Sequence, residues 1–265
     1  TAGLLGGDVR AVVLAPPSWR SALRERLGAG GVKIRLLPAP GEGRICVFLN
    51  EGRRETVVNT DLPLRLGRAL FERIVRAVRR ASRASAYLVL SGSLPPAFGA
   101  ARVRRLFALA AAGRARLAVD QSGRRLAESL VHAPWLIKPN LAEFRRLVGP
   151  VRATLPALLA AAEAVRRRGA GRVLLSLGAR GALLVAPGGR WFAPPLRVSG
   201  VPSPVGSGDA LLGAFLAAAA AGADDPGCLR AGVGAATANL RHRGACRMTA
   251  AEARADARRV KVHAV

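Results

Sequence analysis

The sequence has few residues of the kinds that build disulfide frameworks, zinc sites or histidine-based catalytic centres. Its 265 residues include three cysteines, three histidines and 4% aromatic residues. Cys46, Cys228 and Cys246 are scattered and have no CxxC spacing, which argues against a disulfide framework and against a zinc knuckle. Three histidines leave little scope for a catalytic triad that depends on histidine.

Long hydrophobic runs are also scarce. The uncharged stretch at 210–223 is too short and too rich in alanine and glycine to span a bilayer. No basic segment followed by an apolar one opens the chain, so nothing in it resembles a secretory leader. We therefore expect a cytoplasmic protein without a membrane partner.

Acidic residues are few, and lysine is rarer still. Sixteen acidic residues face 42 basic ones, a net charge of +26, and only Lys33, Lys138 and Lys261 are lysines. Nucleic-acid binders concentrate such charge in a tail or on one face, among aromatic residues. Here the arginines are dispersed along the chain in pairs and triplets. The pattern predicts loose, salt-sensitive contact with polyanions but no specific nucleic-acid partner.

Hydrophobic residues, in contrast, make up 51% of the chain, enough for a sizeable core. Short apolar segments alternate with segments of helical period, which predicts βαβ units and a mainly parallel sheet. No linker or repeat divides the sequence, so we expect a single domain over 1–265. The expected strands are 87–90, 117–119, 135–137 and 173–175, and the expected helices include 64–80, 155–168 and 209–221.

Two segments have the pattern of β-hairpins instead. In the range 44–59, two apolar strands flank a polar turn, and we expect this hairpin to form a small sheet of its own. A second hairpin is expected at 182–193, around Pro187-Gly188-Gly189. In folds of this class, ligands bind at the carboxyl ends of the parallel strands, so the loops there are candidates for a site.

The strongest local signal is the segment PVGSGDALL at 204–212. Gly206, Ser207 and Gly208 precede a helix, so their free backbone N–H groups can hold an anion. Asp209 beside an anion site is unfavourable, unless its carboxylate removes a proton from the hydroxyl that attacks a bound phosphoryl group. The alternative is an ordinary aspartate at a helix start, stabilised by the helix dipole.

A second signal is KPNLAE at 138–143. Asn140 and Glu143 share a face of a starting helix, and an amide with a carboxylate suits a hydrated Mg²⁺ that also binds phosphate oxygens. Their spacing fits a capping box equally well, and spacing alone favours that alternative. Lys138 stands out because this chain nearly always uses arginine, so a retained lysine indicates a need for a point charge.

Two further loops lie where a ligand is expected. The segment 176–181 is either a tight turn or backbone that approaches a nucleotide, and 91–96 carries the hydroxyls of Ser91 and Ser93. The sequence contains no GxxxxGK[ST], GxGxxG, GxSxG or HExxH motif.

Taken in order, these segments resemble the ribokinase-like (PfkB) carbohydrate kinases, in particular the branch of 1-phosphofructokinases and tagatose-6-phosphate kinases. The matching segments are GEGR (41–44), SGSLPP (91–96), VDQSG (119–123), KPNLAEF (138–144), SLGARGALLV (176–185) and PVGSGDALLGAFLA (204–217). The resemblance implies a three-layer α/β/α fold with a small β-sheet lid. The family's opening strand, its NPALD-like segment and its GGKG segment have no counterpart here, so the chain resembles the family from a few dozen residues inward.

The resemblance also implies roles for individual residues. Asp209 would be the catalytic base, and Gly206, Ser207 and Gly208 would form the anion hole. Arg44 would bind the phosphate of the sugar, with Ser91, Ser93 and Asp209 near the sugar itself. Mg²⁺ would lie near Asn140 and Glu143. ATP would be bound by Lys138, Asn140, Ser176, Leu177, Gly178, Ala179, Arg180, Gly181 and Gly208.

The implied reaction transfers the γ-phosphoryl group of ATP to a hydroxyl of a phosphorylated ketohexose. Fructose 1-phosphate is the expected acceptor, and the product would be fructose 1,6-bisphosphate. The alternatives are a kinase for another sugar or a nucleoside, such as one for tagatose 6-phosphate or fructose 6-phosphate, and an inactive relative that only binds ATP or polyanions. A homodimer formed through the β lid is the expected assembly.

Overall fold

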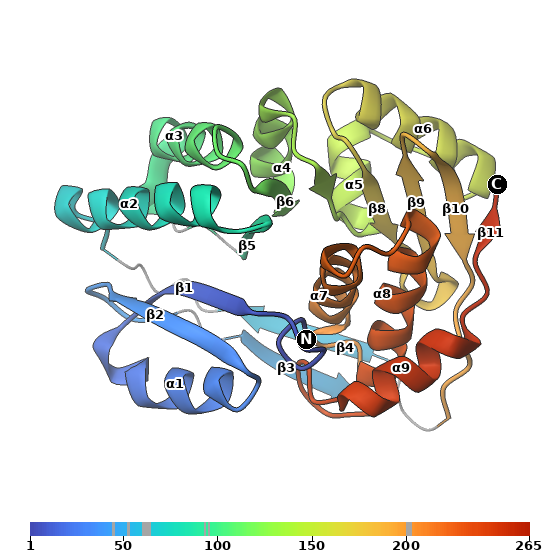
Figure 1. Cartoon of the computed structure of the whole chain (residues 1–265), viewed down its shortest axis with the longest axis horizontal. Helices are drawn as coiled ribbons and strands as arrows, with labels where there is room; N and C mark the ends of the chain where they lie inside the picture. Colours follow the sequence, from blue (N-terminus) through green and yellow to red (C-terminus); the bar gives the residue numbers. More distant parts are fainter. Residues whose placement is uncertain (44–45, 52–53, 60–64, 93, 95, 200–202) are drawn as a thin grey trace.

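The computed structural model describes residues 1–265 except 44–45, 52–53, 60–64, 93, 95 and 200–202 (Figure 1). The strands are β1 (Val9–Ala15), β2 (Val32–Pro38), β3 (Cys46–Glu51), β4 (Arg54–Asn59), β5 (Tyr87–Ser91), β6 (Arg116–Asp120), β7 (Leu136–Ile137), β8 (Val173–Ser176), β9 (Ala182–Ala186), β10 (Gly189–Ala193) and β11 (His263–Ala264). The α-helices are α1 (Arg20–Gly28), α2 (Arg68–Ala84), α3 (Gly99–Ala111), α4 (Gly123–Ser129), α5 (Leu141–Val148), α6 (Leu155–Arg167), α7 (Ser207–Ala220), α8 (Asp225–Asn239) and α9 (Ala250–Arg259). Within the described part of the chain, none of these helices is both long and apolar enough to cross a membrane.

The main sheet has seven strands in the order β11-β10-β9-β8-β7-β6-β5. Strands β5 to β8 are parallel, and the pairs from β8 to β11 are antiparallel. Together with the parallel pair β1–β2, the α/β architecture with a mainly parallel sheet is confirmed. The hairpin expected at 182–193 is also present, as β9 and β10.

The central strands are buried on both faces, which explains why their sequences are continuous apolar runs. Val119, Ile137 and Leu175 pack on one face in a core shared with α2, α3, α4 and α6. Ala118, Leu136 and Leu174, which alternate with them along the strands, pack on the opposite face against α7 and α8 (Figure 1). The helices therefore form a layer on each side of the sheet, as expected for a three-layer fold.

The N-terminal part forms a βαβ unit that the sequence analysis did not identify. Strands β1 and β2 pair in parallel, connected by α1, and form a sheet separate from the main one. Charged residues alternate with Val9, Ala11 and Ile34 in these strands, and period-two alternation is a strand signal that could have been used. Among the described residues, β5 is the edge strand of the main sheet opposite β11, and its Val89 is 38% exposed.

Strands β3 and β4 form an antiparallel pair within the range predicted for the first hairpin. The register runs from Cys46 opposite Asn59 to Glu51 opposite Arg54, and this pair makes a sheet of its own. That the hairpin closes over a ligand stays a prediction, as does the assignment of 1–265 to a single domain.

Candidate active site

The carboxyl ends of the parallel strands bring residues from four distant segments to one edge of the sheet. Ser91 ends β5 and lies opposite Asp120, which ends β6. Lys138 follows β7, and its neighbour Asn140 forms a bridge to Ser176 at the end of β8. The segments that the sequence analysis selected as loops at strand ends are therefore neighbours along one edge (Figure 1).

A buried ion pair lies at the centre of this edge. The Lys138 ammonium is 3.1 Å from Asp120 Oδ1, and Lys138 is only 5% exposed. Burial raises the pKa of Asp120, Lys138 lowers it, and the carboxylates of Asp209 and Glu143 raise it again. The carboxylates of Asp209 and Glu143 therefore lie close enough to act on Asp120, and the Lys138 ammonium opposes their effect.

The segment 204–208, at the start of α7, is the predicted anion-binding loop, and it meets this ion pair. Gly206 precedes α7 with a φ of +78°, in the left-handed region that glycine adopts readily, and Ser207 begins the helix. The expectation of three free N–H groups is wrong for Ser207, because its N–H donates to the Pro204 carbonyl at 3.1 Å in the turn before α7. A Cβ atom at position 208 would lie 3.3 Å from Lys138 Nζ, so glycine lets the ammonium lie close to the backbone of the loop. Asp209 is exposed in the first turn of α7. The site thus combines a helix N-terminus and a buried ammonium, both favourable to an anion, with an accessible carboxylate.

Asn140 and Glu143 form the capping box that their spacing favoured. Asn140 Oδ1 accepts a hydrogen bond from the Glu143 backbone N–H, and Glu143 Oε2 accepts one from the Asn140 N–H, both at 2.9 Å. The box holds both side chains in a fixed orientation at the start of α5. Their role toward Mg²⁺ stays a prediction, because among the described residues no three His, Cys, Asp or Glu side chains form a ready-made metal site.

The loop at 176–181 is a tight turn whose tip faces solvent. Gly178 and Gly181 have φ values of +60° and +95°, and the Leu177 N–H donates to the Gly181 carbonyl at 2.9 Å. Residues 178–180 are exposed, while Arg180 Nη1 donates to the Ala153 carbonyl at 3.0 Å. The turn leaves its backbone accessible to a ligand, and its role in binding ATP stays a prediction.

Replacing Gly181 with alanine should destabilise this turn. The positive φ alone costs an L-residue about 1–2 kcal/mol, and the new Cβ atom would collide with the Ala193 carbonyl oxygen. Gly188→Ala in the β9–β10 turn is the matched control, because its Cβ atom would approach nothing closer than the Trp191 ring at 3.7 Å. Thermal unfolding should show a lower Tm for Gly181→Ala than for Gly188→Ala, and equal Tm values would contradict the strain argument.

Not every predicted residue can be placed. Arg44 and Ser93 lie outside the described residues, so their expected contacts with the substrate stay predictions. Ser91 is exposed at the end of β5, next to Asp120, as a residue near an acceptor sugar would need to be.

The structure adds three residues to which the sequence analysis assigned no role. Asp120 lies within the VDQSG segment, a signal that could have been used, and it holds Lys138. The next residue, Gln121, is buried, and its Nε2 donates to the Gly92 carbonyl at 2.7 Å, which holds the backbone just after β5. Asn239, at the end of α8, contacts the anion-binding loop from a distant segment and has no local sequence signal.

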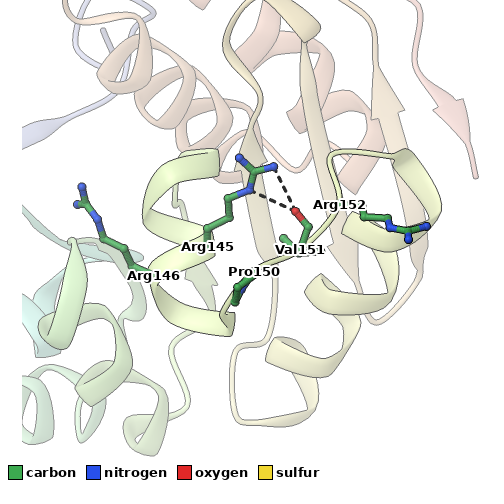
Figure 2. A pocket seen from close by; sticks show the side chains of 5 residues that line it. All are labelled: Arg145, Arg146, Pro150, Val151 and Arg152. Atoms are coloured by element: carbon green, nitrogen blue, oxygen red, sulfur yellow. Dashed lines mark hydrogen bonds between the residues drawn. The ribbon is translucent and has the colours of Figure 1, made fainter.

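A hollow of about 620 Å³ beside α5 is separate from this set. It is lined by Arg145, Arg146, Pro150, Val151 and Arg152, and the Arg145 guanidinium donates to the Val151 carbonyl from Nε at 3.3 Å and from Nη2 at 3.2 Å (Figure 2). None of the predicted site residues lines it, so the candidate site is defined by converging polar groups and not by this hollow.

Comparisons with known proteins identify the family and its relatives. Residues 2–252 match the family described as pfkB family carbohydrate kinase. A 1-phosphofructokinase of Haloferax volcanii is 34% identical over 232 residues, which cover 88% of this chain and 73% of the relative. The ATP-dependent 6-phosphofructokinase isozyme 2 of Mycobacterium tuberculosis is 34% identical over 217 residues, which cover 80% of this chain and 62% of the relative.

The same agreement is found among solved structures. Phosphofructokinase-2 from Escherichia coli, in complex with substrates and products, superposes with a TM-score of 0.86 at 26% identity. The superposition covers 97% of this chain and 84% of that chain. Fold and sequence family therefore agree with each other.

Proposed function

Because the chain belongs to the pfkB family of carbohydrate kinases, we propose that it transfers the γ-phosphoryl group of ATP to a hydroxyl of a phosphorylated ketohexose. Fructose 1-phosphate is the proposed acceptor, and fructose 1,6-bisphosphate the product. The observation that carries the proposal is the approach of the buried Lys138 ammonium to Gly208, next to the exposed Asp209 carboxylate. In that arrangement a phosphoryl group can bind beside Lys138 and Gly208, and the Asp209 carboxylate can accept a proton next to it.

The chemistry follows from the charges at the site. Asp209 takes the proton of the attacking sugar hydroxyl as the new P–O bond forms and the bond between the γ-phosphorus and ADP breaks. The backbone N–H groups of Gly206 and Gly208 and the Lys138 ammonium stabilise the negative charge on the transferred group, whereas the Ser207 N–H would first have to leave the Pro204 carbonyl. Catalysis of this kind depends mainly on the positions of donors and charges, which the buried ion pair with Asp120 keeps fixed.

A Mg²⁺ ion that arrives with the phosphates of ATP is part of the proposal. Its support is that Asp209 and Glu143 both act electrostatically on Asp120, so a divalent cation would offset negative charge there in addition to Lys138. Mg²⁺ commonly uses one or two carboxylates together with water and phosphate oxygens. Asn140 and Glu143 would hold the ion, which would supply neutralisation of the phosphate charge when bound.

A coupled assay of ADP release with fructose 1-phosphate, fructose 6-phosphate and fructose tests the proposal. We expect the highest kcat/KM with fructose 1-phosphate. Because arginine binds phosphate with two parallel hydrogen bonds, Arg44→Ala should raise KM for the sugar phosphate and leave KM for ATP nearly unchanged. Equal effects on both KM values would argue for an unphosphorylated acceptor.

The second candidate acceptor is fructose 6-phosphate, supported by the similarity to the 6-phosphofructokinase isozyme 2 of Mycobacterium tuberculosis. A higher kcat/KM with that substrate would favour it. Binding of ATP without turnover of any sugar would instead favour a relative that only binds ligands.

We also propose that two copies of the chain form a homodimer through the hairpin at 44–59. The phosphofructokinase-2 of Escherichia coli has a tetrameric inhibited form, so a tetramer is the alternative assembly for this chain.

A further inference from the structure

The fully buried side-chain amide of one residue links the anion-binding loop to the loop that follows α8 in the sequence. Asn239 is 0% exposed and lies at the C-terminal end of α8. Its Nδ2 donates to the Val205 carbonyl at 2.8 Å and to Ser207 Oγ at 3.1 Å, while its Oδ1 accepts a hydrogen bond from the Cys246 N–H at 2.7 Å. One side chain thus connects two loops that are about 40 residues apart in the sequence.

The chemistry of the partners determines the orientation of this amide. The Val205 carbonyl can only accept a hydrogen bond, and the Cys246 N–H can only donate one. A flipped Asn239 would place oxygen against oxygen and nitrogen against nitrogen, so a single orientation satisfies both loops. Asn239 therefore connects the two loops in one defined geometry.

Each of the two joined loops contains a residue with a positive φ. Gly206 has a φ of +78°, and a Cβ atom there would lie 2.5 Å from Ala245 Cα, so the loop after α8 packs directly on the anion-binding loop. Cys246 has a φ of +52°, which is unfavourable for a residue with a side chain. Without the amide, the Val205 carbonyl, the Ser207 hydroxyl and the Cys246 N–H would each lose a partner at a part-buried position.

We propose that Asn239 is a positioning residue that holds the Gly206–Gly208 amides in the geometry needed to bind the transferred phosphoryl group. It acts on the reaction only through the loop, since its contacts are with Val205, Ser207 and Cys246. The effect on turnover rests on the proposed kinase function, whereas the effect on the loop does not.

Three variants separate this role from general stability. Asn239→Leu keeps the branched shape of the side chain, is larger and loses all three hydrogen bonds, whereas Asn239→Asp keeps the size and an acceptor for the Cys246 N–H but loses both donated hydrogen bonds. Thr237→Val is the matched control, because Thr237 is also buried in α8 but its Oγ1 donates only to the Val233 carbonyl of its own helix.

We expect Asn239→Leu to lower kcat about 10- to 100-fold, the effect of a small misplacement of groups at a reacting centre. KM for ATP should change much less, and Thr237→Val should keep the kcat of the parent chain. Asn239→Asp should lie between them and serves as the second variant if Asn239→Leu does not fold.

Hydrogen exchange measured by mass spectrometry reports on the loop without any turnover. The amides at 205–209 should exchange faster in Asn239→Leu than in Thr237→Val, and Cys246, whose Sγ is 3.9 Å from the Gly206 carbonyl, should be alkylated faster. Exchange, alkylation and kcat equal to those of Thr237→Val would overturn the proposal. If the parent chain phosphorylates no sugar, the proposed function fails, but the exchange measurement still decides whether Asn239 positions the loop.

Discussion

Replacing Asp209 with asparagine should lower kcat about 10²- to 10⁴-fold, the usual contribution of a positioned general base. Asparagine keeps the size of the side chain and cannot accept the proton of the attacking hydroxyl. The affinity for ATP should change little, because the backbone amides of Gly206, Ser207 and Gly208 remain in place. Steady-state kinetics with fructose 1-phosphate and isothermal titration with Mg-ATP measure the two quantities separately.

The alternative role of Asp209, an acidic residue that stabilises a helix start, makes a different prediction. Loss of that interaction would cost about 0.3–1 kcal/mol of stability and leave turnover unchanged. Asp224→Asn is the matched control, because Asp224 is an exposed acid at the start of α8 and an asparagine can still accept the hydrogen bond from the Gly227 N–H. A variant Asp209→Asn with most of its turnover retained would remove Asp209 from the role of base.

Replacing Lys138 with methionine should destabilise the fold by about 3–5 kcal/mol, the cost of removing one partner from a buried ion pair. Asp120 would keep its burial and the repulsion of Asp209 and Glu143, but lose the interaction that lowers its pKa. Affinity for ATP should fall as well, because the ammonium lies next to the Gly208 backbone where a phosphate is expected. Chemical denaturation and isothermal titration would measure both losses.

The pH dependence of the loss of stability in Lys138→Met tests whether the buried Asp120 carboxylate causes it. A carboxyl group whose pKa is raised in the folded state stabilises the fold fully below its unfolded pKa, and this contribution is lost as the pH rises through the folded pKa. Lys138→Met raises the pKa of Asp120 further, so its deficit should be smallest at acidic pH and grow as the pH rises above about 4. Lys33→Met is the matched control, since Lys33 pairs with Asp8 at 2.8 Å on the exposed surface. Similar deficits in both variants would contradict the argument from burial.

Local patterns determined many of the elements but not all of the helix ends, since the helix expected at 64–80 runs from Arg68 to Ala84 and the one expected at 209–221 from Ser207 to Ala220. The apolar runs at 117–119 and 173–175 became β6 and β8, because strands buried on both faces have such runs. The glycine-rich segment before the helix expected at 209–221 indicated where that helix begins, and Gly206 has the left-handed conformation that glycine adopts readily just before α7. The capping box of Asn140 and Glu143 is equally local, because both partners lie within one helical turn.

Only the tertiary structure decided which of these local features meet. The approach of Lys138 to Gly208 joins positions 70 residues apart, and it depends on the packing of α7 on the face of the sheet to which β7 contributes Leu136. Asp120 lies in the VDQSG segment, but nothing in that segment identifies Lys138 as its partner, and Asn239 has no local sequence signal at all. The parallel pair β1–β2 could have been expected from alternation, but its separation from the main sheet could not. Periodicity and capping are interactions within a few residues, which a sequence contains directly, whereas a buried charge or amide is defined by neighbours that the chain brings together only when it folds.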